Sequence, residues 1–148
     1  MIKIICVGKL KESYFKDALK EYEKRLSKYT KLEILELPDY NYDVEKTILE
    51  EGKNILSKIK DNDFVITLDI NGKELDSVEL SSFIDNNITK NLVFVIGGSY
   101  GLSFDVKQRS NYSLSFSKLT FPHQLFRVML LEQIYRAFKI IRKESYHK

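Results

Sequence analysis

Short apolar runs alternate along this chain with longer stretches in which apolar side chains recur every three or four residues. A short apolar run bounded by turn residues predicts a β-strand, and the three-to-four spacing predicts an amphipathic helix. The predicted strands span residues 2–7, 32–37, 64–70, 92–96 and 112–116. The predicted helices span residues 14–29, 43–60, 77–87, 102–109 and 123–143. This order predicts an α/β fold with a mostly parallel sheet of about five to six strands flanked by helices.

The length and composition fit one domain. The chain has 148 residues, of which 43% are hydrophobic and 30% charged, and it contains no linker, low-complexity tract or internal repeat. We therefore expect a single domain over residues 1–148. No apolar run approaches the ~20 residues of a membrane-spanning helix, the first run ends at Gly8, and the single cysteine cannot form an internal disulfide. These features predict a cytoplasmic protein without a membrane partner.

Charge is distributed unevenly along the chain. Residues 107–148 carry nine basic and two acidic side chains, whereas the whole chain has a net charge of only +3. Lysine and arginine side chains gain affinity for phosphates by releasing counterions, so this basic third could contact a polyanion such as RNA from one side. The alternative is a basic helix face that meets only solvent.

The last predicted helix has an unusually wide apolar face. At 100° per residue its apolar side chains sweep an arc of about 200°, whereas one buried face needs only ~100°. These side chains are Phe126, Met129, Leu130, Leu131, Ile134, Ala137, Phe138, Ile140 and Ile141. We therefore expect a second apolar surface, most simply another copy of the chain, which predicts a homodimer. Arg127 falls inside the arc, where it must reach solvent, pair with a carboxylate or serve a site.

A glycine-rich segment follows the fourth predicted strand. Residues 94–101 read FVIGGSYG and lead into a helical pattern. Glycine allows a ligand to approach the backbone closely, and open α/β sheets bind ligands at the carboxyl ends of their strands. The spacing matches neither a phosphate-binding loop nor the dinucleotide-binding fingerprint. A binding turn and a plain tight turn both remain open.

Two later segments could contribute to a site. Residues 113–124 (SLSFSKLTFPHQ) bring small hydroxyl side chains to a strand end, so their main chain could line a pocket. His123 follows Pro122 at a helix start, where a structural role is favoured. The chain ends in Tyr146, His147 and Lys148, an aromatic ring, an imidazole and a cation that could reach over a partner's glycine-rich turn. One cysteine and two histidines provide no metal-binding set.

Taken together, segments from end to end of the chain resemble the RlmH family. They are VGKLK at 7–11, FVIGGSYG at 94–101, QRSNY at 108–112, LSFSKLTFPHQ at 114–124, EQIYRAFK at 132–139 and YHK at 146–148. This family belongs to the SPOUT class of methyltransferases that use S-adenosylmethionine. The resemblance implies a C-terminal trefoil knot that shapes the cofactor pocket. It also implies a homodimer that methylates N3 of a pseudouridine in helix 69 of 23S ribosomal RNA, on the assembled ribosome and not on DNA.

The resemblance also implies site residues. The residues that would form the S-adenosylmethionine pocket are Leu68, Gly97, Phe116, Ser117, Lys118, Leu119, Thr120 and Phe121. Tyr146, His147 and Lys148 correspond to the catalytic tail of the family, and Arg142 corresponds to a basic position near that tail. No metal is implied.

These residues suggest roles that can be tested. The first hypothesis is that His147, or a water molecule it orients, takes the N3 proton while Tyr146 packs on the substrate or cofactor. The second is that Lys118, Arg142 and Lys148 hold RNA phosphates. The main alternative is a non-enzymatic ribosome- or RNA-binding α/β module, and another is a flavodoxin-like nucleotide-binding regulator. Binding of S-adenosylmethionine separates the methyltransferase from both.

Overall fold

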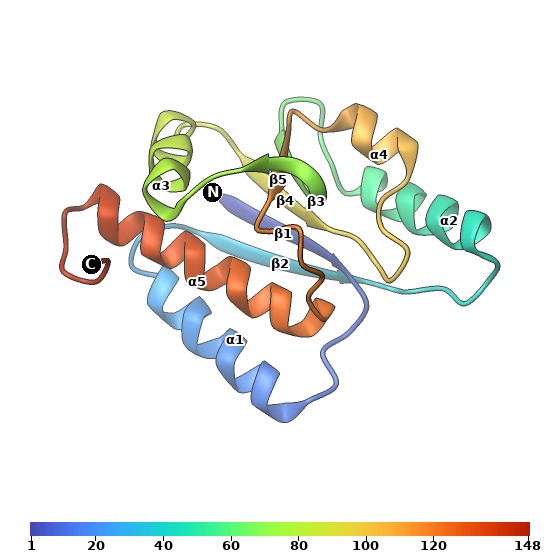
Figure 1. Cartoon of the computed structure of the whole chain (residues 1–148), viewed down its shortest axis with the longest axis horizontal. Coiled ribbons are helices and arrows are strands. Elements are labelled where there is room, and N and C mark those ends of the chain that lie inside the picture. The colour runs from blue at the N-terminus through green and yellow to red at the C-terminus, as the bar shows by residue number, and fades with distance from the viewer.

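A computed structural model describes residues 1–148 and contains a five-stranded sheet in the order β2-β1-β4-β3-β5, with every pair parallel (Figure 1). The strands are β1 (Ile2–Val7), β2 (Leu32–Leu37), β3 (Phe64–Glu74), β4 (Leu92–Ile96) and β5 (Tyr112–Ser115). The helices are α1 (Ser13–Leu26), α2 (Val44–Ser57), α3 (Ser77–Asn86), α4 (Phe104–Arg109) and α5 (His123–Ile141). The predicted α/β fold with a parallel sheet is confirmed, with five strands.

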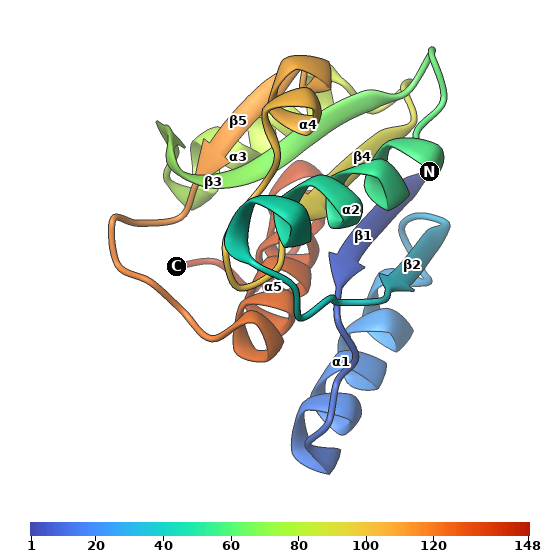
Figure 2. The ribbon, with the colours of Figure 1, turned by 90° about the vertical axis from the view of Figure 1, so that its right-hand side faces the viewer.

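Helices cover both faces of the sheet (Figures 1 and 2). Successive strand side chains point to opposite faces, so Ile4 and Phe94 join the core under α1, α3 and α5. Ile5 and Val93 join a smaller core under α2 and α4. Strands buried on both faces are apolar at nearly every position, which is why they appear as continuous runs in the sequence. None of the helices is long and apolar enough to cross a membrane.

Side-chain caps fix where three of the helices begin. Asp43 accepts a hydrogen bond from the backbone N–H of Lys46 at the start of α2. Asp76 and Glu79 form a reciprocal capping box at the start of α3, and Ser103 accepts from a backbone N–H at the start of α4. Each cap satisfies a backbone donor that has no partner within its own helix.

The third strand is longer than the sequence predicts and carries an irregularity. We expected it to end at residue 70, but β3 continues to Glu74. Leu114 of β5 is in register with both Leu68 and Lys73, so the four residues between them bulge out of the pairing. Asn71 and Gly72 are typical turn residues, which explains why the sequence predicts an end where the strand bulges instead.

The wide apolar arc of α5 is covered largely within the chain. The helix packs against both α1 and α3, and its buried side chains share one core with side chains of the sheet, so it has neighbours on both flanks. Leu130, Leu131, Ile134 and Phe138 are buried there, together with Ala137. The inference from this arc to a second copy counted only the sheet as an internal partner, whereas α1 and α3 bury five of the nine arc residues and leave Phe126, Met129, Ile140 and Ile141 half-buried. The homodimer therefore stays a prediction.

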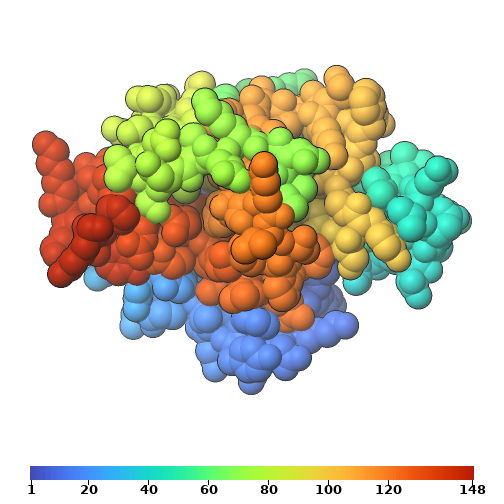
Figure 3. Space-filling model, viewed as in Figure 1, coloured from blue at the N-terminus to red at the C-terminus, as the bar shows by residue number.

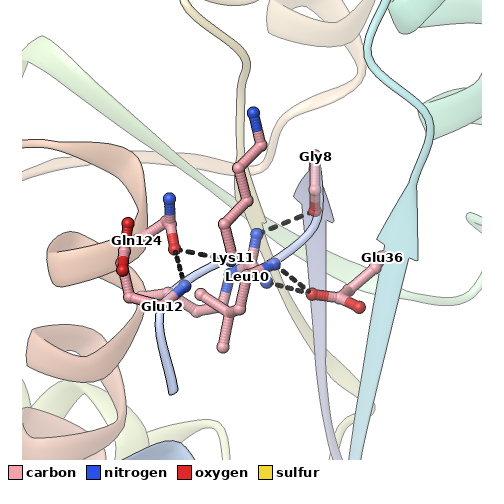
Figure 4. Close-up of polar contacts among 7 residues, drawn as sticks. Gly8, Leu10, Lys11, Glu12, Glu36 and Gln124 are labelled. Atoms are coloured by element: carbon pink, nitrogen blue, oxygen red, sulfur yellow. Dashed lines mark hydrogen bonds and ion pairs between the residues drawn. The ribbon is translucent and has the colours of Figure 1, made fainter. Parts of the chain in front are cut away.

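Arg127, the charged residue inside the arc, pairs with a carboxylate. It is 2% exposed, and its guanidinium donates to Glu36 Oε2 at 2.5 Å and to the Gly8 carbonyl at 3.0 Å. Glu36 also accepts the backbone N–H of Leu10, while Gln124 Oε1 accepts from Lys11 N and Glu12 N (Figure 4). The first turn of α5 thus holds the loop that leads from β1 to α1.

Replacing Arg127 with methionine should lower the free energy of unfolding by about 2–3 kcal/mol. Loss of one partner from a fully buried pair costs ~3–5 kcal/mol. We expect less here because Glu36 is 37% exposed and can be hydrated. Urea unfolding followed by circular dichroism measures the change.

Lys53→Met is the matched control, because Lys53 makes an exposed pair with Glu50 and should change stability by less than about 1 kcal/mol. Equal effects of the two substitutions would contradict a stabilising role for the Arg127 pair.

Candidate active site

A cavity of about 380 Å³ lies at the carboxyl edge of the sheet, where β3, β4 and β5 end. Its walls come from residues 68–71 at the bulge of β3, residues 96–102 after β4, and the loop between β5 and α5. Lys107, His123 and Phe126 complete the lining. This is the edge at which open α/β sheets bind ligands, and the volume lies in the ~300–1,000 Å³ range of small-molecule sites.

The bulge of β3 forms the first wall. Asp69 accepts the backbone N–H of Asn71 at 3.0 Å and forms an ion pair with Lys107 of α4 at 3.4 Å. Gly72 allows the bulge to lie directly on β5, since a Cβ there would be 2.7 Å from the backbone carbonyl carbon of Ser113. The wall therefore depends on close contact between two backbones.

The glycine-rich turn forms the second wall. The Gly101 N–H donates to the Gly98 carbonyl at 3.1 Å, which closes the turn, and Gly101 has a positive φ of 90°. A Cβ on Gly97 would lie 2.8 Å from the Leu102 side chain. A ligand in the cavity therefore meets the backbone of this turn directly.

The loop before α5 forms the third wall. Ser115 donates to the Ser117 carbonyl at 3.0 Å, and the Ser117 hydroxyl accepts the N–H of Leu119 at 2.9 Å. Phe116 and Phe121 both pack on Phe126 of α5, with ring centroids 4.9 and 6.0 Å apart. Figure 3 shows this loop, in orange, on the surface between the green end of β3 and the gold segment after β4. The loop offers a ligand both aromatic faces and main-chain polar groups.

Seven of the eight residues expected to bind the cofactor line this one cavity. They are Leu68, Gly97, Phe116, Ser117, Leu119, Thr120 and Phe121. Lys118 is the exception, because its side chain is exposed and does not line the cavity although its neighbours do. Main-chain groups cannot be recognised from composition, so apart from the family resemblance only the glycines and the strand ends indicated this site in the sequence.

Several cavity residues were missed or interpreted differently. Asp69 and Asn71 lie in the unexpected bulge, and Phe126 was assigned only to the apolar arc. His123, for which a structural role was favoured, also lines the cavity. Burial lowers the pKa of His123, and the nearby charge of Arg127 lowers it further. At neutral pH this residue therefore presents an uncharged imidazole to the cavity.

The C-terminal tail folds back onto its own helix α5. Tyr146 Oη donates to Glu132 Oε2 at 2.6 Å, and its ring packs edge-on against Tyr135 with centroids 5.0 Å apart. The hydrogen bond to the Glu132 carboxylate, assisted by burial, raises the pKa of Tyr146 to about 12. Tyr146 is therefore protonated at neutral pH and acts as a hydrogen-bond donor, not as a base.

His147 lies beside Arg136. The Arg136 Nη1 atom is 3.1 Å from His147 Nδ1, and Arg136 is itself held by Glu132 at 2.9 Å. A guanidinium can only donate hydrogen bonds, so Nδ1 accepts and the neutral imidazole carries its proton on Nε2. In this position the exposed nitrogen of His147 is a donor.

Arg142 and Lys148 lie near this end of the molecule. The Arg142 guanidinium lies 5.3 Å from the centre of the Tyr29 ring, and both cations are exposed. The tail and the cavity are separate: in Figure 3 the dark red tail is at one end of the view, and the orange loop lies at its centre. The structure thus brings the expected cofactor residues together and the expected catalytic residues together, but not the two groups within one chain.

No group of three or more His, Cys, Asp or Glu side chains is arranged to hold a metal ion. The residues described above form a small-molecule cavity with glycine, hydroxyl and aromatic walls, and a separate tail with a tyrosine, an imidazole and cations.

Comparisons with known proteins match the chain along its whole length. The model of a family described as predicted SPOUT methyltransferase matches residues 1–147. A Clostridium botulinum protein named ribosomal RNA large subunit methyltransferase H is 60% identical, with 99% of each chain covered. A Clostridium beijerinckii protein of the same name is 55% identical, again over 99% of each chain.

Among solved structures, the chain is similar in fold to a probable methylase family protein from Haemophilus influenzae. The TM-score is 0.59 at 12% identity, over 99% of this chain and 70% of the other. At that identity the likeness concerns the fold alone.

Proposed function

Because the chain belongs to the SPOUT methyltransferase family, and within it to the ribosomal RNA large subunit methyltransferases H, we propose that it methylates N3 of a pseudouridine in helix 69 of 23S ribosomal RNA. The activity itself is methyl transfer from S-adenosylmethionine to large-subunit ribosomal RNA. The finer part of the proposal is the base, its position and the assembled ribosome as substrate. We further propose that all 148 residues act as one domain, in the cytoplasm where ribosomes are, with the C-terminal trefoil knot of this class.

The observation that carries the proposal is the cavity at the carboxyl edge of the sheet. Its volume of about 380 Å³, its aromatic residues and its glycine turn suit an adenosine with a flexible tail. When bound, S-adenosylmethionine supplies an electrophilic methyl group on a sulfonium. Most of the rate then comes from holding acceptor and donor in line, which is a task for rigid walls.

The residues proposed to hold the cofactor act mainly through backbone and ring faces. Phe116 and Phe121 offer flat apolar surfaces, and Ser117 and Thr120 bring main-chain groups from the same loop. His123, uncharged for the reasons given above, adds no positive charge beside a cationic cofactor. Lys118 points to solvent, so we assign it to RNA phosphates and not to the cofactor.

The separation of the tail from the cavity supports a homodimer. Two large apolar side chains that line the cavity are well exposed, Leu119 at 71% and Tyr100 at 50%, and Phe104, four residues after Tyr100, is 73% exposed. Such exposure is unusual for a surface that meets only water. In our proposal a second copy covers this rim and brings its own tail to the cavity.

Within that dimer the tail acts on the RNA base. Tyr146, protonated at neutral pH, packs and donates, and His147 takes the N3 proton, directly or through a water molecule. To accept that proton at Nδ1, His147 must leave Arg136, so we propose that the tail changes its contacts when it meets the cavity. Lys148 and Arg142 hold phosphates beside it.

Calorimetric titration with S-adenosylmethionine, together with the mass in solution, is the first test. We expect saturable binding by a dimer. Ribosomes incubated with the protein should then gain a methyl group that nucleoside mass spectrometry locates on N3 of a helix 69 pseudouridine.

Three outcomes would contradict separate parts of this proposal. A folded dimer that binds ribosomes but no S-adenosylmethionine, even with ribosomes present, would be the RNA-binding module. Methylation of another nucleotide would overturn the proposed position. A monomer that is fully active would exclude the shared site.

A further inference from the structure

Glu51 of α2 is buried directly behind the glycine turn. The residue is 3% exposed, and its Oε2 atom accepts the backbone N–H of Tyr40 at 3.1 Å. Its other oxygen, Oε1, is buried and has no hydrogen-bond partner. Burial raises the pKa of the Glu51 carboxyl, an effect only partly offset by the bond from Tyr40. An unpaired buried carboxylate oxygen is costly, so it requires an explanation.

The unpaired oxygen faces the turn. A Cβ built on Gly98 would lie 2.6 Å from Glu51 Oε1, so this oxygen lies against the turn backbone. Within the turn, Gly98 and Gly101 face each other in an isolated antiparallel bridge, with the Gly101 N–H donating to the Gly98 carbonyl, whereas the N–H group of Ser99 donates to no protein acceptor. A carboxylate oxygen without a donor therefore lies against a turn that holds a backbone N–H without an acceptor.

The surroundings do not give Glu51 another role. No lysine or arginine pairs with it, and it does not belong to a metal-binding group. Its neighbour Gly52 packs on Ser103, the cap of α4, where a Cβ would clash with the hydroxyl oxygen, so α2 lies close against the start of α4 at this point. The carboxyl is thus fixed in place while the turn beside it is bonded only to itself.

We propose that Glu51 is a positioning residue: its Oε1 atom accepts the backbone N–H of Ser99 when S-adenosylmethionine occupies the cavity. This inference rests on the proposed function, since it takes that cofactor as the ligand. A bond that forms only in the bound state contributes to cofactor affinity and not to the stability of the free protein. In the free protein the buried oxygen has no partner, which lowers stability, but it is already in place to accept the bond when the cofactor binds.

Glu51→Gln tests the proposal, because glutamine keeps the shape and its amide oxygen can still accept from Tyr40. The amide NH₂ then takes the place of Oε1 beside the turn, and an NH₂ group cannot accept a hydrogen bond from a backbone N–H. We expect the Kd for S-adenosylmethionine to rise about 10- to 100-fold, the range expected for a hydrogen bond to a charged acceptor. The Tm of the free protein should stay the same or rise, because an unpaired buried charge has been removed.

Two controls make the result specific. Glu50→Gln changes the neighbouring carboxylate, which pairs with Lys53 at the surface, and should leave both the Kd and the Tm unchanged. S-adenosylhomocysteine lacks the sulfonium charge, and its Kd should rise by the same factor in Glu51→Gln. A loss confined to S-adenosylmethionine would overturn positioning in favour of simple charge attraction.

The remaining outcomes are also decisive. An unchanged Kd in Glu51→Gln, with or without a lower Tm, would overturn the proposal and leave Glu51 a core residue. If the variant fails to fold, Glu51→Asp, whose shorter carboxylate cannot reach the turn, should fold and bind the cofactor as weakly, and normal binding by it would overturn the proposal. If the wild-type protein itself does not bind the cofactor, the proposed function fails instead.

Discussion

Replacing His147 with alanine is expected to lower the rate of methyl transfer by about 10²- to 10⁴-fold, the usual contribution of a positioned acid or base. The Kd for S-adenosylmethionine should change by less than about twofold, because His147 is proposed to act on the RNA base and not on the cofactor. Single-turnover methylation of ribosomes measures the rate, and calorimetry measures the Kd.

Ser145→Ala is the matched control for this prediction, since Ser145 is the exposed neighbour of Tyr146 and makes no side-chain hydrogen bond that the structure records. Its rate should equal that of the unmodified protein. If His147→Ala also keeps the full rate, the proton acceptor lies elsewhere, and His123 at the cavity becomes the next residue to test.

The second large effect concerns stability. Gly72→Ala should lower the free energy of unfolding by about 3 kcal/mol, at the upper end of the usual cost of overpacking. The new Cβ would lie 2.7–2.8 Å from backbone atoms of Ser113 and Leu114, which cannot move aside as a flexible side chain can. The corresponding fall in Tm is about 6–12 °C for a chain of this size.

Gly101→Ala separates crowding from backbone strain. Gly101 has a positive φ of 90° but open space around its Cα, so alanine there should cost only about 1 kcal/mol. Thermal unfolding of the two variants gives the comparison. Equal losses would show that β3 and β5 can separate at the bulge, contrary to the tight contact described above.

The sequence predicted the elements well because each one satisfies a simple rule. Buried parallel strands are apolar at almost every position, and α1 and α2 each bury one face, so both patterns can be recognised in the sequence alone. The strand order, by contrast, depends on how the helices cross the sheet. The bulge of β3 was hidden because Asn71-Gly72 is typical of a turn, and only pairing with Leu114 on both sides shows that the strand continues.

The sequence predicted those site residues that directly follow a strand. It did not predict residues that reach the site only through contacts between distant parts of the chain. Gly97 and residues 116–121 follow directly after strands, so their place at the carboxyl edge followed from the topology. Glu51 lies in the middle of an ordinary amphipathic helix, and nothing in its sequence neighbourhood distinguishes it from Glu50. Its unpaired oxygen becomes visible only when the turn is placed beside it.

The hydrogen bonds between the first turn of α5 and the loop from β1 to α1 also affect how the chain folds. Arg127 bonds the carbonyl of a residue 119 positions earlier, and Gln124 bonds Lys11, 113 positions earlier. During synthesis β1 and the loop after it are therefore made well before α5, the helix with which they form these bonds. Contacts between such distant positions slow folding, because much chain entropy is lost before they form. A nascent chain that lacks α5 should remain sensitive to proteases, and the core should close only after the final helix has left the ribosome.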